Sequence, residues 1–358
     1  MKIKKIQDAD LKGKEVLVRV SFNVPYEGKV IKEPYKIETV KKTIDYIIAQ
    51  GGKVTMMSNL GRPEEYQKEH PGGMEWMSMF SFNNIIQDIQ KILGIRIKLI
   101  PSCDSNVIKK YRLSYSDQCD AFLLENIKFY KEEGENDASF SAELAENFDI
   151  FVNESFSDSH RGYVSTVGVA KRLPSYAGFQ TQKEVENLSR VKDHPEHPAV
   201  AIIGGAKIET KLPLINSFVK NYDFVLVGGK IANEAIDGGM QFDSKVILPI
   251  DFANDGRLDI GEKTIEKFCE IISHAETVVW NGPMGLFEKK PYDNGTRKIL
   301  QAIAESGAFS VIGGGESVQA VNESNLEHEL SFISTGGGAM LEFLSGEPMP
   351  GIDVLMEK

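Results

Sequence analysis

Four glycine clusters, two with a lysine close behind, are the residues of this sequence best suited to chemistry. Each ends an apolar run, at Ala-Ile-Ile-Gly-Gly-Ala-Lys (201–207), Val-Leu-Val-Gly-Gly (225–229), Val-Ile-Gly-Gly-Gly-Glu (311–316) and Ile-Ser-Thr-Gly-Gly-Gly (333–338). Such runs are typical of buried parallel strands, and open α/β sheets place ligands at the carboxyl ends of these strands. Glycine allows the backbone to approach a phosphate, and a following helix offers free N–H groups. Any one cluster could be a tight turn without a ligand, but four together predict a nucleotide site.

Strands and helices alternate along the whole chain, which predicts parallel sheets with helices on both faces. In the first half, the expected strands are Glu15–Val20, Lys53–Ser58, Arg96–Ile100, Ala121–Glu125 and Ile150–Val152, and the expected helices are Lys36–Gln50, Ser81–Leu93 and Phe140–Phe148. The polar, methionine-rich residues 64–79 are expected to form a surface loop. In the second half, the expected strands are Ala199–Ile203, Phe224–Val227, Thr277–Trp280, Ser310–Ile312 and Ser331–Ile333.

The length of 358 residues favours two domains. We expect the boundary at a long amphipathic helix, Ala177–Val191, and the polar run that follows it. The sequence therefore predicts an α/β protein with two doubly wound parallel-sheet domains, residues 1–176 and 199–345, joined through a helix and linker at 177–198.

Composition narrows the classes of protein that this chain can belong to. A net charge of −11 argues against broad nucleic-acid binding, so an anionic substrate must meet a local basic pocket. Three unevenly spaced cysteines favour buried thiols over disulfides or a zinc site. No apolar stretch approaches a membrane span, and the N-terminus does not resemble a secretory signal. We expect a cytoplasmic protein that binds small molecules, without nucleic-acid or membrane partners and with no indication of a state beyond a monomer.

Motifs spread over nearly the whole chain resemble those of the phosphoglycerate kinase family. In the first half they are Val-Arg-Val-Ser-Phe-Asn-Val-Pro (18–25), Ser-Asn-Leu-Gly-Arg-Pro (58–63), Leu-Glu-Asn-Ile-Lys-Phe (124–129), Val-Asn-Glu (152–154), His-Arg (160–161) and Ser-Thr-Val-Gly-Val (165–169). In the second half they are Gly-Gly-Ala-Lys (204–207), Trp-Asn-Gly-Pro-Met-Gly-Leu-Phe-Glu (280–288), Gly-Gly-Gly-Glu-Ser (313–317) and Ser-Thr-Gly-Gly-Gly-Ala (334–339). The Trp-Asn-Gly-Pro-Met-Gly run is the most specific of these.

The resemblance implies a hinge helix between the domains, closure of the domains, and a C-terminal tail (346–358) that returns to the first domain. It implies Mg²⁺ with ATP or ADP on the second domain and 3-phosphoglycerate, or a related phosphorylated acid, on the first. The reaction would be reversible phosphoryl transfer to a carboxylate, which gives an acyl phosphate. A carboxylate is already ionised at neutral pH, so the reaction needs charge neutralisation, alignment and exclusion of water rather than a general base.

For the nucleotide, the resemblance places Lys207 beside the transferring phosphoryl group and Lys211 toward the α-phosphate, with Glu288 on the ribose. A spacing of four residues would put both ammonium groups on one helix face. For Asn281, a role in the pocket and a role in the turn beside Gly282 are about equally favoured. The full nucleotide set is Gly205, Ala206, Lys207, Lys211, Gly228, Gly229, Asn281, Pro283, Glu288, Gly313, Gly314, Gly315, Glu316 and Ser317, with Glu316 as the magnesium ligand. Catalytic roles would fall to Lys36, Lys207, Gly314 and Gly337, where the glycines present N–H groups to the phosphate.

The predicted acid site departs most from the family pattern. The full set is Ser21, Asn23, Lys36, Asn59, Arg62, Lys128 and Arg161. Ser21 stands where the family has an aspartate, and the resemblance implies that this aspartate recognises the substrate hydroxyl. Lys36 and Lys128 replace arginines. The positive charge is kept, but the planar guanidinium, which can form two parallel hydrogen bonds with a carboxylate or phosphate, is lost. Asn59 replaces a histidine.

The nucleotide side also differs from the family pattern. Glu316 replaces an aspartate, and a glutamate can still bind magnesium through a longer side chain. Lys230 replaces a glycine and is expected to enter or cap the adenine slot. The segment between Met240 and Leu258 is shorter than usual, so a helix and a hairpin near the nucleotide are expected to be missing.

Three functions remain open from the sequence, in this order of preference. The first is an ATP-dependent kinase of 3-phosphoglycerate, favoured by the retained lysines and glycine loops. The second is the same chemistry on another carboxylic acid, suggested by Ser21, Lys36 and Asn59. The third is a non-catalytic nucleotide-binding relative, suggested by Glu316 and Lys230.

Overall fold

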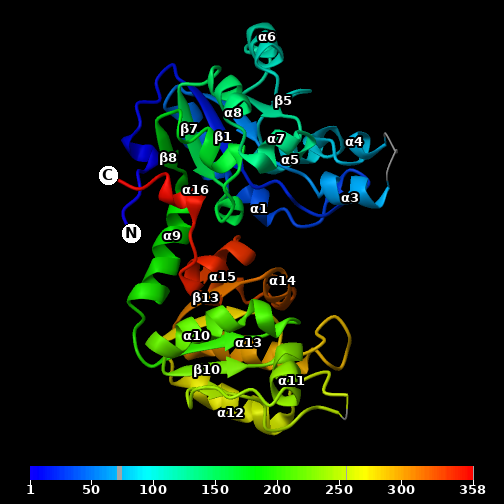
Figure 1. Ribbon diagram of the computed structural model, residues 1–358, viewed down its shortest axis with the longest axis vertical. Coiled ribbons are helices and arrows are strands. Elements are labelled where there is room, and N and C mark those ends of the chain that lie inside the picture. The colour runs from blue at the N-terminus through cyan, green and yellow to red at the C-terminus, as the bar shows by residue number, and fades with distance from the viewer. Residues whose placement is uncertain (71–74, 255, 358) are drawn as a thin grey trace. The chain divides into compact units, whose positions relative to one another are not determined.

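The computed structural model describes residues 1–70, 75–254 and 256–357, which form two compact units. Unit 1 comprises Met1–Lys183 and Met349–Lys358, and unit 2 comprises Glu184–Pro348 (Figure 1). The chain passes from one unit to the other within helix α9 (Phe179–Asp193). The C-terminal helix α16 (Pro350–Asp353) lies in unit 1, where the Gly351 carbonyl accepts a hydrogen bond from Asn153 Nδ2 at 2.9 Å.

Unit 1 is built on a six-stranded sheet in which all neighbouring strands are parallel. Its order is β5-β6-β4-β1-β7-β8, so the first strand of the chain lies inside the sheet. The strands are β1 (Glu15–Val20), β4 (Lys53–Met57), β5 (Ile97–Ile100), β6 (Ala121–Leu124), β7 (Ile150–Glu154) and β8 (Ser175–Ala177). A two-stranded hairpin, β2 (Tyr26–Glu27) with β3 (Val30–Ile31), follows β1.

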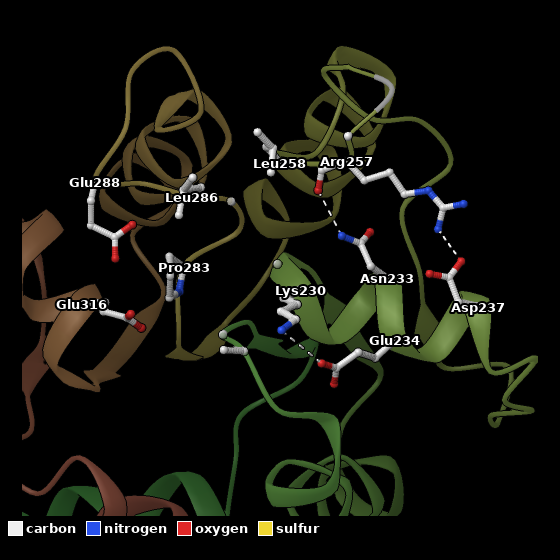
Figure 2. A pocket seen from close by; sticks show the side chains of 15 residues that line it. Lys230, Asn233, Glu234, Asp237, Arg257, Leu258, Pro283, Leu286, Glu288 and Glu316 are labelled. Atoms are coloured by element: carbon white, nitrogen blue, oxygen red, sulfur yellow. Dashed lines mark hydrogen bonds and ion pairs between the residues drawn. The ribbon is translucent and has the colours of Figure 1, made fainter.

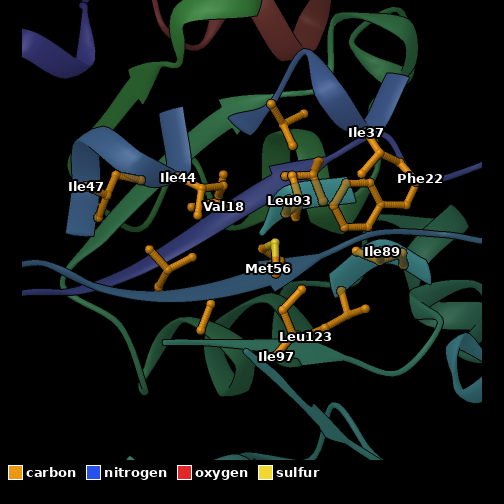
Figure 3. Packing of buried hydrophobic residues seen from close by; sticks show 14 of the residues in the cluster. Val18, Phe22, Ile37, Ile44, Ile47, Met56, Ile89, Leu93, Ile97 and Leu123 are labelled. Atoms are coloured by element: carbon orange, nitrogen blue, oxygen red, sulfur yellow. The ribbon is translucent and has the colours of Figure 1, made fainter. Parts of the chain in front are cut away.

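The period-two alternation of β1 separates the two faces of this sheet. Val16, Val18 and Val20 belong to a core with helices α2 (Lys41–Ala49) and α5 (Ile86–Leu93) (Figure 3). Leu17 belongs to the core of the other face, with α6 (Ser105–Tyr115) and α8 (Ala138–Ala145). Helices therefore cover both faces of the sheet, as the alternation of elements predicts.

The expectation of a surface loop at 64–79 is wrong for the described residues. They form α3 (Pro63–Glu69) and α4 (Trp76–Met79), while residues 71–74 of the expected loop lie outside the described part of the chain. Proline at the first helical position, followed by two glutamates, is a helix-start signal that outweighs the polar composition. The other helices of unit 1 are α1 (Tyr35–Glu38), which takes the first turn of the long helix expected at 36–50, and α7 (Lys131–Glu135).

Unit 2 has a second six-stranded parallel sheet, in the order β11-β10-β9-β12-β13-β14. Its strands are β9 (Ala199–Ile203), β10 (Phe224–Val227), β11 (Val246–Ile247), β12 (Thr277–Asn281), β13 (Phe309–Gly313) and β14 (Phe332–Ile333). Its helices are α10 (Leu212–Asn221), α11 (Gly229–Asp237), α12 (Glu262–Ser273), α13 (Asn294–Ser306), α14 (Gly315–Ser324) and α15 (Gly338–Ser345). The strand order reverses between β9 and β12, which is the position where doubly wound sheets bind their ligands.

The segment between α11 and α12 spans residues 238–261. Its described residues contain a single strand, β11, and one isolated bridge between Phe252 and Ile260. The two parallel sheets with their helices confirm the predicted α/β fold class.

The prediction of three buried cysteine thiols is only partly correct. Cys103 is buried, whereas Cys119 and Cys269 are half-buried, and all three are free. None of the described helices combines the length and apolar character that crossing a bilayer requires.

Candidate functional site

The first two glycine clusters serve backbone packing at the point where strand order reverses. A Cβ atom on Gly204 would lie 2.1 Å from the Pro283 carbonyl oxygen, and one on Gly282 would lie 2.4 Å from the carbonyl carbon of Gly204. Gly229, with φ of +65°, would meet the same Pro283 oxygen at 2.7 Å. The turns after β9, β10 and β12 therefore touch backbone to backbone, which only glycine permits.

The last two clusters are open only at the starts of the helices that follow them, because a Cβ on Gly313 would lie 2.2 Å from Met340 Sδ. Ideal Cβ atoms on Gly315, Gly337 and Gly338 would meet nothing within 4 Å. These glycines lie at the N-termini of α14 and α15, where backbone N–H groups have no partner within the helix. Gly314 and Gly337 have φ of +100° and +40°, and these conformations disfavour other residues. The predicted phosphate contact of Gly337 is therefore sterically accessible, whereas a Cβ on Gly314 would lie 3.0 Å from Asn281 Nδ2, so that access to a phosphate at α14 begins at Gly315.

A pocket of about 430 Å³ opens beside these turns (Figure 2). Its lining includes six of the residues predicted for the nucleotide: Gly205, Ala206, Gly229, Pro283, Glu288 and Glu316. Glu288 and Glu316 lie on one side, opposite the side chains of α11. The volume lies within the range of small-molecule sites.

The α11 wall of the pocket is polar, with Lys230, Asn233, Glu234 and Asp237 in its lining. Lys230 lines the pocket, and its ammonium lies 3.9 Å from Glu234 Oε1 on the same helix. Asp237 pairs with Arg257 at 2.7 Å, and Asn233 Nδ2 donates to the Arg257 carbonyl at 3.0 Å. Residues 256–258 thus close this wall by contacts to α11, and no sequence motif indicated Asn233 or Arg257.

Asn281 links two of the predicted phosphate-binding elements. Its Oδ1 accepts a hydrogen bond from Lys211 Nζ at 2.5 Å, and its Nδ2 donates to the Gly313 carbonyl at 2.9 Å. Burial lowers the pKa of Lys211 to about 8, against the opposing effect of the Glu316 carboxylate. Asn281 is itself buried, so it orients the lysine and the β13 turn.

Glu316 has the chemistry of a magnesium ligand. Partial burial and the nearby Glu288 carboxylate raise its pKa, while Lys211 acts in the opposite direction. A divalent cation would relieve this repulsion, and Mg²⁺ characteristically uses one or two carboxylates together with substrate phosphates. Within the described residues, no three or more acidic, histidine or cysteine side chains are arranged so that they could hold a metal ion, so the fit depends on phosphate ligands.

Lys207 and Ser317, both predicted to bind the nucleotide, differ in whether their side chains are available to a ligand. Lys207 is exposed at the start of a 3₁₀ turn (Ile208–Thr210), and its ammonium has no bonded partner among the described residues. Ser317 is buried, and its hydroxyl accepts the Gly282 N–H at 2.8 Å. The serine thus fixes the β12 turn, whereas the lysine is available to a ligand.

The fourth glycine cluster is anchored by Glu184 on α9. This buried carboxylate accepts hydrogen bonds from Ser334 Oγ at 2.8 Å and from the Thr335 N–H and Oγ1, each at 2.7 Å. Two residues later the chain reaches Gly337. Glu184 therefore sets where the N-terminus of α15 lies.

Glu184→Ala is expected to lower kcat about tenfold or more with a smaller change in KM, because small displacements of phosphate-positioning groups are costly. Steady-state kinetics, together with thermal unfolding, measures this. Glu186→Ala, at an exposed position on the same helix, is the matched control and should leave both constants unchanged. An equal kinetic effect in both variants would contradict the anchoring role.

In unit 1, the four predicted cations follow the carboxyl ends of strands. Lys36 lies in α1, Arg62 precedes α3, Lys128 lies in a 3₁₀ turn (Ile127–Phe129) after β6, and Arg161 follows the 3₁₀ turn Phe156–Asp158 after β7. Because the six strands of the sheet are parallel, Arg62, Lys128 and Arg161 share one edge of it, while Lys36 follows the β2–β3 hairpin that comes after β1. The Arg62 side chain is 72% exposed and pairs with Glu65 at 3.2 Å.

Three uncharged residues of the predicted acid site, Ser21, Asn23 and Asn59, form hydrogen bonds with other residues of the chain. Asn23 Oδ1 accepts the Gly61 N–H at 2.8 Å, which ties the first motif to the loop after β4. Ser21 Oγ lies 2.9 Å from Ser157 Oγ. Asn59 is buried and its Oδ1 accepts a hydrogen bond from Arg19 Nη2 at 2.7 Å. Asn59 thus contacts a cation that sequence reasoning had missed.

That cation, Arg19, is fully buried in β1 on the face of Leu17. Besides Asn59, its guanidinium pairs with Asp158 at 3.2 Å and donates to Ser165 Oγ at 3.0 Å. Ser165 in turn donates to the buried carboxylate of Glu133. Burial raises the pKa of Glu133, while the nearby Arg19 acts to lower it. The sequence did contain a signal for this network, namely a charged residue inside an apolar strand, because a buried arginine requires polar or charged partners.

Comparisons with known proteins agree with this geometry. A family model described as "Phosphoglycerate kinase" matches residues 6–247 and 243–347. A phosphoglycerate kinase of Borrelia turicatae is 37% identical over 99% of this chain and 100% of its own length, and one of Dictyoglomus turgidum is 37% identical over 99% and 98%. The solved phosphoglycerate kinase of Coxiella burnetii superposes with a TM-score of 0.82 at 31% identity, covering 99% of this chain and 98% of that one. The enzyme from Pyrococcus horikoshii OT3 gives 0.85 at 27% identity, with the same coverage.

Proposed function

The chain belongs to the phosphoglycerate kinase family, and from this premise we propose that it carries out the glycolytic transfer of a phosphoryl group between ATP and 3-phosphoglycerate through the residues described above. It is a phosphotransferase with a carboxyl group as acceptor. The observation that supports the residue roles best is the pair of open glycine N-termini, at α14 and α15, in the same unit as the pocket.

The nucleotide is proposed to bind unit 2. Its base and ribose would occupy the pocket, with Glu288 accepting hydrogen bonds from the ribose hydroxyls. Lys211, held by Asn281, would neutralise the phosphate chain, and the N–H groups at Gly314 and Gly337 would donate to the transferring phosphoryl group. Mg²⁺, when bound through Glu316 and the phosphates, supplies charge neutralisation.

The acid is proposed to bind at the carboxyl edge of the unit 1 sheet. Arg62, Lys128 and Arg161 would hold its phosphate, and Lys36 its carboxylate. That carboxylate is the nucleophile and needs no base. Lys207, whose ammonium is free of partners within the described residues, would follow the phosphoryl group during transfer.

A coupled assay with 3-phosphoglycerate, ATP and magnesium tests this function. We expect ADP release that depends on all three components. Absence of turnover at high enzyme concentration would reject 3-phosphoglycerate as the substrate. Ser21, Lys36 and Asn59 favour a second candidate, a kinase of another carboxylic acid, which a screen of acids for ADP release would detect.

The lowered pKa of Lys211 predicts a pH dependence of nucleotide binding. Below about pH 8 the side chain is an ammonium ion that attracts phosphate, and above that pH it becomes neutral. The Kd for ADP should therefore rise as pH increases through 8, by up to about tenfold per pH unit. Isothermal titration at pH 7 to 9.5 measures this. Lys211→Arg, which stays charged, should flatten the profile, and a wild-type Kd that stays constant would refute the assignment.

We further propose that the protein works as a monomer in the cytoplasm. Light scattering at micromolar concentration should give a mass near the 39.8 kDa of one chain. A dimer mass would reject the monomer.

A further inference from the structure

One carboxylate interacts electrostatically with Lys128, a cation of the proposed acid site. Asp158, in the turn that follows β7, pairs with Arg19 at 3.2 Å and accepts a hydrogen bond from Ser155 Oγ at 2.6 Å. Its side chain is 19% exposed, whereas that of Arg19 is 1% exposed. The carboxylate therefore stands between the buried guanidinium and the edge of the sheet where the acid is proposed to bind.

Asp158 remains ionised in this place. Burial acts to raise its pKa, but Arg19, Ser155, Lys128 and His160 outweigh that effect and hold the pKa below its ordinary value. Lys128 is one of the cations proposed to hold the substrate phosphate. A fixed negative charge beside it weakens anion binding unless the carboxylate gains a hydrogen bond from the ligand.

The carboxylate is also connected to the first motif of the chain. Ser157 Oγ lies 3.4 Å from Asp158 Oδ2 and 2.9 Å from Ser21 Oγ. Ser21 occupies the position at which the family resemblance leads us to expect an aspartate. A carboxylate is thus supplied to the same cluster of hydroxyls, but from the end of β7 instead of the end of β1.

We propose that Asp158 is a specificity residue that accepts a hydrogen bond from the C2 hydroxyl of the acid substrate, so that the enzyme selects 2-hydroxy acids. The inference rests on the proposed function for the identity of the acid. An O–H···O⁻ hydrogen bond is short and charge-assisted, and it offsets the repulsion between Asp158 and the anionic ligand. A site built to bind a hydroxyl also discriminates strongly against an analogue that lacks it.

Calorimetric binding without nucleotide tests the proposal, using 3-phosphoglycerate and its 2-deoxy analogue, 3-phosphonooxypropanoate. We expect the wild-type chain to prefer the hydroxylated acid about 10- to 100-fold. Asp158→Asn, which keeps the side-chain shape, should reduce this preference at least about fivefold. The double variant Ser21→Asp/Asp158→Ser should restore it, because it moves the carboxylate back to β1. Glu65→Gln, which alters an exposed carboxylate paired with Arg62, should keep the wild-type preference.

Three results would each overturn the proposal: a wild-type chain that binds both acids equally, a wild-type chain that binds neither acid, and an Asp158→Asn variant that keeps the full preference. If Asp158 served only as a partner for Arg19, its replacement would weaken both acids alike and lower the melting temperature. Turnover is measured separately, so a chain that prefers the 2-hydroxy acid without transferring phosphate would refute the kinase function and leave this inference standing.

Discussion

Lys207→Ala is expected to lower kcat about 10²- to 10³-fold, which is the usual cost of removing one charge that stabilises a transition state. The exposed ammonium has no bonded partner among the described residues, so its removal should leave folding intact. A coupled assay at saturating substrates, with thermal unfolding beside it, measures both quantities. KM should change much less than kcat, because the interaction is proposed to strengthen in the transition state.

Lys220→Ala is the matched control for this experiment. Lys220 is also an exposed lysine of unit 2, near the end of α10, but it lies away from the glycine turns. Its variant should retain wild-type kcat. A Lys207→Ala enzyme with more than half of the wild-type kcat would remove Lys207 from the catalytic set.

Arg19→Met is expected to lower the free energy of unfolding by about 3–5 kcal/mol, because it leaves Asp158 and Glu133 without their buried cation. Typical domains have only about 5–15 kcal/mol of stability, so unit 1 would become marginal. Urea unfolding followed by circular dichroism measures the loss. Arg62→Met should cost less than about 1 kcal/mol, since its ion pair with Glu65 is exposed. A loss in Arg19→Met as small as the one expected for Arg62→Met would show that the buried network adds little stability.

Much of the fold follows from local sequence. The expected strands Ala199–Ile203 and Phe224–Val227 have the observed bounds, because an apolar run bounded by glycine has few alternatives. The helix bounds were less predictable. The expected helix at 177–191 begins at Phe179, because Ala177 pairs with Asn153 as the last residue of β8. That pairing joins residues far apart in the chain and leaves no local signal.

The site could be predicted where a motif carries its own geometry. Glycine turns after strands identified both the open N-termini and the crowded backbone, but the sequence could not separate the two, because the crowding arises between different turns. Ser317 was assigned to the nucleotide, yet its hydroxyl bonds to Gly282, an orientation that depends on how α14 rotates against the sheet. Arg19 and Asp158 were missed because their partners come from separate segments of unit 1.

The backbone contacts among Gly204, Gly229 and Gly282 restrict how this enzyme can be redesigned. A library that randomises these turns to alter base preference would consist mostly of unfolded clones. Lys230, Asn233 and Arg257 present side chains to the same pocket and can be exchanged without separating the turns. Efforts to change the preferred nucleobase by directed evolution should therefore begin with α11 and the loop that contains Arg257.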